Sequence, residues 1–210
     1  GAFLAFYAFI GFEDMVNVAE ETKNPQRTMP LAILISLIAS TILYLLVAVV
    51  AIAAVPPSEL AASKAPLLLV YSREAGNAAL FLTIIGITAA VNGVIVQVIM
   101  GSRILFGLSK QGWIDTRLSE VNKETKTPLV ATVFVVGLMI IACVALPLVS
   151  LARLTSLIVL GIFALVNISL VVIKRRHPNH KGLITVPKII PYLGFISCIV
   201  IILFELNILG

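Results

Sequence analysis

Charged residues are scarce in this chain, where Asp, Glu, Lys and Arg together make up 12% of 210 residues. Soluble domains usually carry about 25% charged residues, so the chain lacks the polar surface of a soluble globule. This scarcity argues against a soluble enzyme, a nucleic-acid-binding domain and a disordered tail. Hydrophobic residues reach 60%, and the net charge of +5 falls in short connections between apolar runs. That distribution is typical of a membrane protein.

Cysteine and histidine are also rare, with two of each. Cys143 and Cys198 lie in apolar runs, where a free cysteine behaves as a small hydrophobic residue. His177 and His180 lie in a basic connection, where we expect solvated side chains rather than metal ligands. We therefore predict no disulfide framework, no metal and no cofactor. The basic connection is a candidate for contact with anionic lipid head groups.

Long charge-free runs dominate the sequence instead. A helix of about 20 residues crosses a bilayer core, whereas a strand of a membrane barrel needs only about 9–11 alternating residues. We therefore predict an all-α integral membrane protein with six transmembrane helices, forming a single transmembrane domain over residues 1–210. The predicted spans are 1–20, 30–54, 77–106, 128–147, 153–173 and 189–208.

The basic residues are distributed unevenly among the connections between these spans. If the spans alternate in direction, 12 of the 15 Lys and Arg residues share one side of the membrane. Only Lys64, Arg73 and Arg153 fall on the other side. Because short basic connections stay in the cytoplasm, we expect a multi-pass protein of the cell (inner) membrane. A eukaryotic plasma membrane is the alternative.

Proline positions predict several helix boundaries. Pro30 is expected to begin the second span, and Thr127 with Pro128 is expected to cap and begin the fourth. The polar stretch 112–127 is expected to contain a short surface helix.

The first segment carries the most informative residues. Gly11 lies within it, and Glu13 and Asp14 follow shortly afterwards. Acidic residues near membrane depth are costly and indicate function by default. We therefore predict that the helix is interrupted at residues 8–11, as in the discontinuous helices of secondary transporters. The alternative is a shorter span with both acids at the membrane interface.

The segment FYAFIGFEDMVNVAEETKNPQRTMPLAI closely resembles the sixth helix and following loop of the amino acid–polyamine–organocation (APC) permeases. The family pattern is an aromatic-rich stretch ending in GF-E/D, followed by EE-x-KNP-x-R-x-x-P. A second block, GSRILFGLSKQG at residues 101–112, resembles the end of the eighth helix, and TKTPLVATV resembles the start of the ninth. The matching residues of the first pattern are Gly11, Phe12, Glu13, Glu20, Glu21, Lys23, Asn24, Pro25, Arg27 and Pro30.

This resemblance covers essentially the whole chain and implies a LeuT-like fold. Members have a five-plus-five inverted repeat, and the six spans would correspond to helices six to eleven. The chain would then hold the second repeat plus one helix. Because the first repeat is absent and the chain starts with Gly1, we expect a fragment, the later part of a longer protein.

The resemblance also implies where the substrate binds. In the family, backbone carbonyls of the unwound sixth helix hold the substrate amine, and an aromatic residue at the break covers the substrate in several members. The carbonyls would belong to Tyr7, Ala8 and Ile10, with Tyr7 as the first choice of lid and Phe6 and Phe9 as alternatives. An aromatic stripe that packs against lipid or other helices is the competing interpretation. The expected substrate-binding residues are Tyr7, Ala8, Phe9, Ile10 and Gly11.

Three further polar residues are candidates for functional roles. Glu13 is the candidate for a gating or proton-linked carboxylate, and a structural glutamate bonded to neighbouring helices is an equal alternative. Thr88 and Asn92 in the third span are weaker candidates for lining the cavity. Polar residues in membrane helices often only hold helices together.

These observations predict amino acid transport by alternating access, as the C-terminal part of a permease. We expect proton-coupled symport or exchange. The partners would be an amino acid substrate, protons and membrane lipids, without nucleic acid. The alternative is a non-transporting assembly partner or a truncated remnant, which the missing first repeat favours. We expect no enzyme activity, because no convergent set of nucleophile, base or metal ligands lies at membrane depth.

Overall fold

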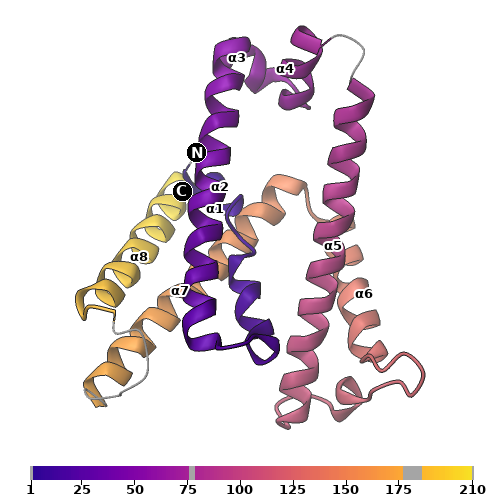
Figure 1. The fold of residues 1–210 in the computed structure, drawn as a ribbon, viewed down its shortest axis with the longest axis vertical. Coiled ribbons are helices and arrows are strands. Elements are labelled where there is room, and N and C mark those ends of the chain that lie inside the picture. The colour runs from indigo at the N-terminus through magenta and orange to yellow at the C-terminus, as the bar shows by residue number, and fades with distance from the viewer. Residues whose placement is uncertain (1, 76–78, 177–185, 210) are drawn as a thin grey trace. The chain divides into compact units, whose positions relative to one another are not determined.

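The computed structural model describes residues 2–75, 79–176 and 186–209, and every regular element in these ranges is a helix. The all-α prediction is therefore confirmed. The chain forms two compact units, one made of Gly1–Leu34 with Leu138–Gly210 and the other of Ile35–Gly137. Each unit has its own internal contacts, and Figure 1 shows the helices that the chain forms.

Four helices of the described residues are long and apolar enough to cross a membrane. A fifth, α6, has 17 residues and is shorter than these four. The first predicted span is interrupted, so the count of six spans stays a prediction. The long helices and α6 are α2 (Pro25–Ala54), α5 (Ala79–Lys110), α6 (Leu129–Ala145), α7 (Leu148–Arg176) and α8 (Ile189–Leu209).

Many side chains of α2 are both apolar and exposed. No residue in its most apolar 18-residue window is buried inside the chain. Large side chains such as Leu43, Leu45 and Val49 are 60–64% exposed. Apolar surface of this extent is typical of contact with a membrane or another protein.

The start of α2 differs from the sequence prediction, which placed it at Pro30. The helix begins at Pro25, so that prediction is wrong. Asn24 has a φ of 53°, and its carbonyl accepts hydrogen bonds from the N–H groups of Arg27 (3.1 Å) and Thr28 (3.0 Å). Asparagine tolerates this left-handed conformation, and proline suits the first helical position. Pro30 therefore lies inside the helix.

In the first unit, α7 packs side by side with α8 and also contacts the short helix α1 (Ala2–Tyr7) (Figure 1). Four of the buried residues on α7 recur every four positions, which places them on one helical face. Two alanines and a serine on this face allow close approach of neighbouring helices. These buried residues are Ala152, Ser156, Leu160 and Ala164.

A close contact between α7 and α8 lies at Gly194. A Cβ atom added there would lie 2.5 Å from Oδ1 of Asn167 on α7. The Asn167 side chain is itself held, because its Nδ2 donates a 2.8 Å hydrogen bond to the carbonyl of Phe163. The side-chain amide therefore occupies the space that a larger residue at 194 would need.

Polar contacts join the two helices at both ends. At one end, Nε of Arg153 lies 3.4 Å from Oε1 of the buried Glu205. At the other end, Nη2 of Arg175 donates a 2.8 Å hydrogen bond to the hydroxyl of Tyr192. The ends of the pair are thus fixed by polar groups and its middle by apolar packing.

In the second unit, two short helices, α3 (Pro57–Ala62) and α4 (Pro66–Ala75), follow α2. An exposed ion pair between Glu59 and Arg73 joins them, and α4 packs against α5. Further along, α5 approaches α6 closely, since a Cβ atom added at Gly101 would lie 3.1 Å from Cγ1 of Val135.

The end of α5 gives a structural reason for the last glycine of the block at residues 101–112. Gly112 has a φ of 77°, and its N–H donates to the carbonyl of Ser109 (3.0 Å). The N–H of Trp113 donates to the carbonyl of Leu108 (3.1 Å), which completes a Schellman motif. The chain then enters the 3-10 helix η3 (Thr116–Ser119), which confirms the predicted short helix in this stretch.

Replacing Gly194 with alanine should destabilise the α7–α8 pair. The new Cβ would force Asn167 away from Phe163, and such overpacking costs about 1–3 kcal/mol. Gly161→Ala on α7 is the matched control, because a Cβ there meets no atom within 4 Å. We expect a lower thermal midpoint for Gly194→Ala in detergent and an unchanged or higher one for Gly161→Ala. Equal midpoints for the two variants would contradict the close contact.

Candidate functional site

The first helix is interrupted where the sequence predicted. Helix α1 ends at Tyr7, residues 8–11 form a turn, and the 3-10 helix η1 (Phe12–Glu21) follows. Within the turn, backbone N–H groups bond to carbonyls three residues earlier. These hydrogen bonds join Phe9 to Phe6 (2.9 Å) and Ile10 to Tyr7 (3.2 Å). The interruption at residues 8–11 is therefore confirmed.

Gly11 sets the direction of the chain as it leaves this turn. Its φ of 123° and ψ of −18° are rarely adopted by residues with a side chain. A Cβ atom added there would meet nothing within 4 Å. Backbone conformation rather than lack of space therefore requires glycine at this position.

The carboxylate of Glu13 is directed back onto the turn. Its Oε2 accepts a 2.8 Å hydrogen bond from the N–H of Gly11, and the residue is half-buried. An acidic side chain near the start of a helix satisfies an otherwise unpaired N–H group and suits the helix dipole. This contact gives Glu13 a structural role at the break.

Phe163 of α7 contacts both segments that flank the break. Its ring meets Phe6 of α1 edge-on, with centroids 6.2 Å apart and planes at 86°. It meets Phe12 of η1 at 5.6 Å and 45°. Sequence reasoning missed Phe163, because an aromatic residue in an apolar run carries no signal of its partners.

The residues expected to bind substrate lie together in this turn. Tyr7 and Ala8 are exposed, with 40% of Tyr7 accessible, while Phe9, Ile10 and Gly11 are half-buried. A hydrophobic cluster adjoins the break, because Phe6 and Phe163, which flank or contact it, pack against a buried core. That core consists of Phe3, Leu160, Ala164 and Cys198.

The weaker candidates lie in the second unit, on α5. Thr88 and Asn92 are both exposed there. The Thr88 hydroxyl donates a 2.8 Å hydrogen bond to the carbonyl of Ile84 one turn earlier, so it is bound within its own helix. The structure groups the turn residues and Glu13 in one unit, and these two belong to the other.

Potential metal ligands do not cluster in the part of the chain that the structure describes. No group of three or more His, Cys, Asp or Glu side chains there could hold an ion. His177 and His180 lie outside the described residues.

Comparison with known proteins gives a family match across nearly the whole chain. The model of the family described as "Amino acid permease" matches residues 1–209. The branched-chain amino acid permease BcaP of Bacillus subtilis is 32% identical over 205 residues, which is 96% of this chain and 44% of that protein. No solved structure gives a significant match.

Two other relatives show the range of the similarity. The methylthioribose transporter of Bacillus subtilis is 27% identical, over 91% of this chain and 41% of that protein. Cationic amino acid transporter 3, mitochondrial, of Arabidopsis thaliana is 30% identical, over 83% of this chain and 29% of that protein. The chain thus spans less than half the length of these relatives.

Removing the Phe163 ring should loosen the interrupted helix. Each aromatic pair is worth about 0.5–1.5 kcal/mol beyond its buried area, so Phe163→Ala loses about 1–3 kcal/mol of support. We expect amide hydrogen exchange at residues 8–14 to accelerate by about 5- to 150-fold. Ile162→Ala is the control, because Ile162 is the neighbouring residue and is 51% exposed. Unchanged exchange in Phe163→Ala would show that the ring does not hold the break.

Proposed function

Because the chain belongs to the amino acid permease family, we propose that it acts as the C-terminal, substrate-binding part of an amino acid transporter. The chain is an integral membrane protein, and its family is not enzymatic. The observation that carries the proposal is the interrupted helix at residues 8–11. Irregular backbone at membrane depth persists only where it is buried in protein or lines a water-filled cavity.

The chemistry of the turn suits the ammonium group of an amino acid. An ammonium has three donors and no acceptor, and each backbone carbonyl has two lone pairs. The Tyr7 carbonyl uses one lone pair for the N–H of Ile10 and keeps the other. The proposed ammonium ligands are the carbonyls of Tyr7, Ala8 and Ile10, with Phe9 and Gly11 completing the site.

The accessible ring of Tyr7 is the proposed cover over the bound substrate. Phe6, an alternative for that role, already packs against Phe163. Thr88 and Asn92 remain proposed cavity residues in the intact protein. The Thr88 hydroxyl donates its proton to Ile84, so its oxygen would accept a hydrogen bond from the substrate, and the Asn92 amide would donate or accept one.

We infer that the chain forms a single transmembrane domain with six spans, equivalent to helices six to eleven of a LeuT-like fold. Transport would proceed by alternating access around the turn, in the cell membrane. Branched-chain amino acids are the first substrates to test, since the Bacillus subtilis relative named above is a branched-chain permease.

Uptake of radiolabelled leucine into proteoliposomes that contain the intact protein tests the proposed function. Gly11→Ala should reduce uptake by about 5- to 150-fold, because a side chain at this φ costs about 1–3 kcal/mol. Gly86→Ala is the control, since a Cβ there meets nothing within 4 Å and uptake should stay within about twofold. If the folded protein takes up neither leucine nor other amino acids into the proteoliposomes, the result would contradict a transport function and favour a non-transporting assembly partner or remnant.

Glu13 is the proposed proton-linked or gating carboxylate, and two variants separate this role from its structural role. Glu13→Gln keeps an oxygen that can accept the Gly11 N–H but cannot bind a proton. Glu13→Ala removes both properties. We expect Glu13→Gln to abolish the pH dependence of uptake and Glu13→Ala to lower uptake at every pH as well.

The dependence of uptake on pH in these variants can also exclude the proton-linked role of Glu13. If Glu13 only fixes the turn, Glu13→Gln should follow the wild-type profile while Glu13→Ala fails. Replacing the exposed Glu120 by Gln changes the charge by the same amount far along the chain and serves as the control.

A further inference from the structure

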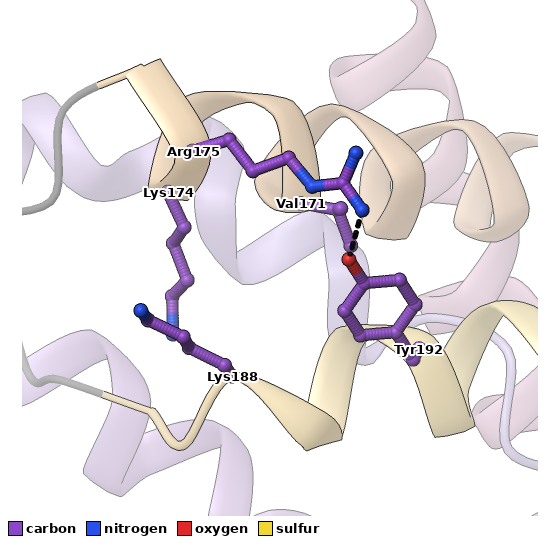
Figure 2. A pocket seen from close by; sticks show the side chains of 5 residues that line it. All are labelled: Val171, Lys174, Arg175, Lys188 and Tyr192. Carbon is purple, nitrogen blue, oxygen red and sulfur yellow. Dashed lines mark hydrogen bonds between the residues drawn. The ribbon is translucent and has the colours of Figure 1, made fainter.

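A cavity lies where α7 ends and α8 begins, in the first unit. Its volume is about 350 Å³, which is within the usual range of ligand pockets. Figure 2 shows the lining side chains of α7 above, with Lys188, just before α8, and Tyr192 of α8 below. The lining residues are Val171, Lys174, Arg175, Lys188 and Tyr192.

Among the described residues that line the cavity, three of five are cations and none is acidic. None of these three cations is paired with a carboxylate among the residues that the structure describes. Three like charges around one cavity repel one another, and a bound anion removes that repulsion. The lining therefore favours a negatively charged ligand.

Two hydrogen bonds position two of the three cations at the cavity. Arg175 Nη2 donates to the hydroxyl of Tyr192, as the dashed line in Figure 2 shows, and Lys174 Nζ donates to the carbonyl of Val186. A guanidinium has five N–H donors and an ammonium has three, so both groups keep donors for a ligand. Arginine with lysine is the usual combination for phosphate recognition.

The cavity also lies where the apolar helices α7 and α8 meet the basic connection between them. Ile173 and Ile189 flank it along the chain, with 54% and 62% of their surfaces exposed. Lysine and arginine at the ends of membrane helices reach the head-group region, and tyrosine is enriched at the same depth. Exposed apolar side chains next to phosphate-binding cations suit a ligand with both a phosphate and acyl chains.

We propose that this cavity binds the phosphate of an anionic phospholipid. Phosphatidylglycerol is the simplest probe, because it carries one phosphate charge and a neutral glycerol. A soluble phosphate would use the same cations but would gain nothing from the exposed isoleucines. The site is separate from the turn at residues 8–11 and does not depend on what the protein transports.

Native mass spectrometry of the delipidated intact protein tests this proposal. Phosphatidylglycerol and phosphatidylcholine with identical chains are added in turn, and the bound lipid is counted. We expect tighter binding of phosphatidylglycerol, and about 25-fold weaker binding of it in Lys174→Gln/Lys188→Gln, since each basic residue contributes roughly fivefold. Arg117→Gln/Lys123→Gln removes the same charge from exposed residues outside the cavity and should bind like wild type.

The single variant Lys188→Gln guards against a folding defect, because it spares the Lys174 hydrogen bond to Val186. It should weaken phosphatidylglycerol binding about fivefold at an unchanged thermal midpoint. Equal phosphatidylglycerol binding in the cavity and control double variants would overturn the proposal, as would equal binding of the two lipids to wild type.

Competition separates a lipid from a soluble phosphate. Glycerol 3-phosphate and inorganic phosphate are titrated against the bound phosphatidylglycerol. We expect neither to displace it at millimolar concentration. Displacement at micromolar concentration would assign the cavity to a soluble phosphate and overturn the lipid assignment.

Discussion

The packing of Phe163 against Phe6 and Phe12 holds the interrupted helix to the rest of its unit. A break in a helix gives up regular backbone hydrogen bonds, which is costly where no water replaces them. The turn recovers some of these bonds through its own carbonyls, and Glu13 supplies one more to Gly11. Local hydrogen bonds alone leave the two flanking segments free to change direction. One aromatic ring in contact with both segments restricts that freedom.

Phe163 can do this only because α7 is itself held firmly. The carbonyl of Phe163 accepts the Asn167 side chain, and Asn167 in turn fills the space against Gly194 of α8. Phe163, which contacts the break, is thus one helical turn from Asn167 and its close contact with Gly194 of α8. The ion pair of Arg153 with Glu205 adds a polar contact at a distant point of the same helix pair. A close helix pair therefore supports the irregular segment.

The interruption at residues 8–11 could be predicted because its signals are local. Gly11 permits a backbone conformation that other residues avoid, and acidic residues so close to an apolar stretch need an explanation. The sequence predicts that α2 starts at Pro30, whereas it starts at Pro25. Either proline is acceptable near a helix start, so composition does not distinguish them. Only the conformation of Asn24 decides between them.

Contacts between distant segments could not be predicted in the same way. Phe163 and Gly194 lie in apolar runs whose composition is compatible with many helix pairings. The sequence of those runs does not predict that Phe163 contacts Phe6 and Phe12, or that Asn167 lies against Gly194. The family resemblance indicated the turn but carried no information about its support from α7.

The two proposed sites on this unit differ in the charge that they select. Carbonyl oxygens and Glu13 make the turn at residues 8–11 attractive to a cationic group, whereas Lys174, Arg175 and Lys188 attract an anion. Phe163 and Lys174 are separated by about 16 Å along α7, at 1.5 Å per residue. At that distance the cations of the cavity compete little for the carboxylate of a substrate in the turn, because solvent and salt screen them. An anionic lipid at the cavity would instead relieve the repulsion at the end of the α7–α8 pair, and so strengthen the support on which Phe163 and the turn depend.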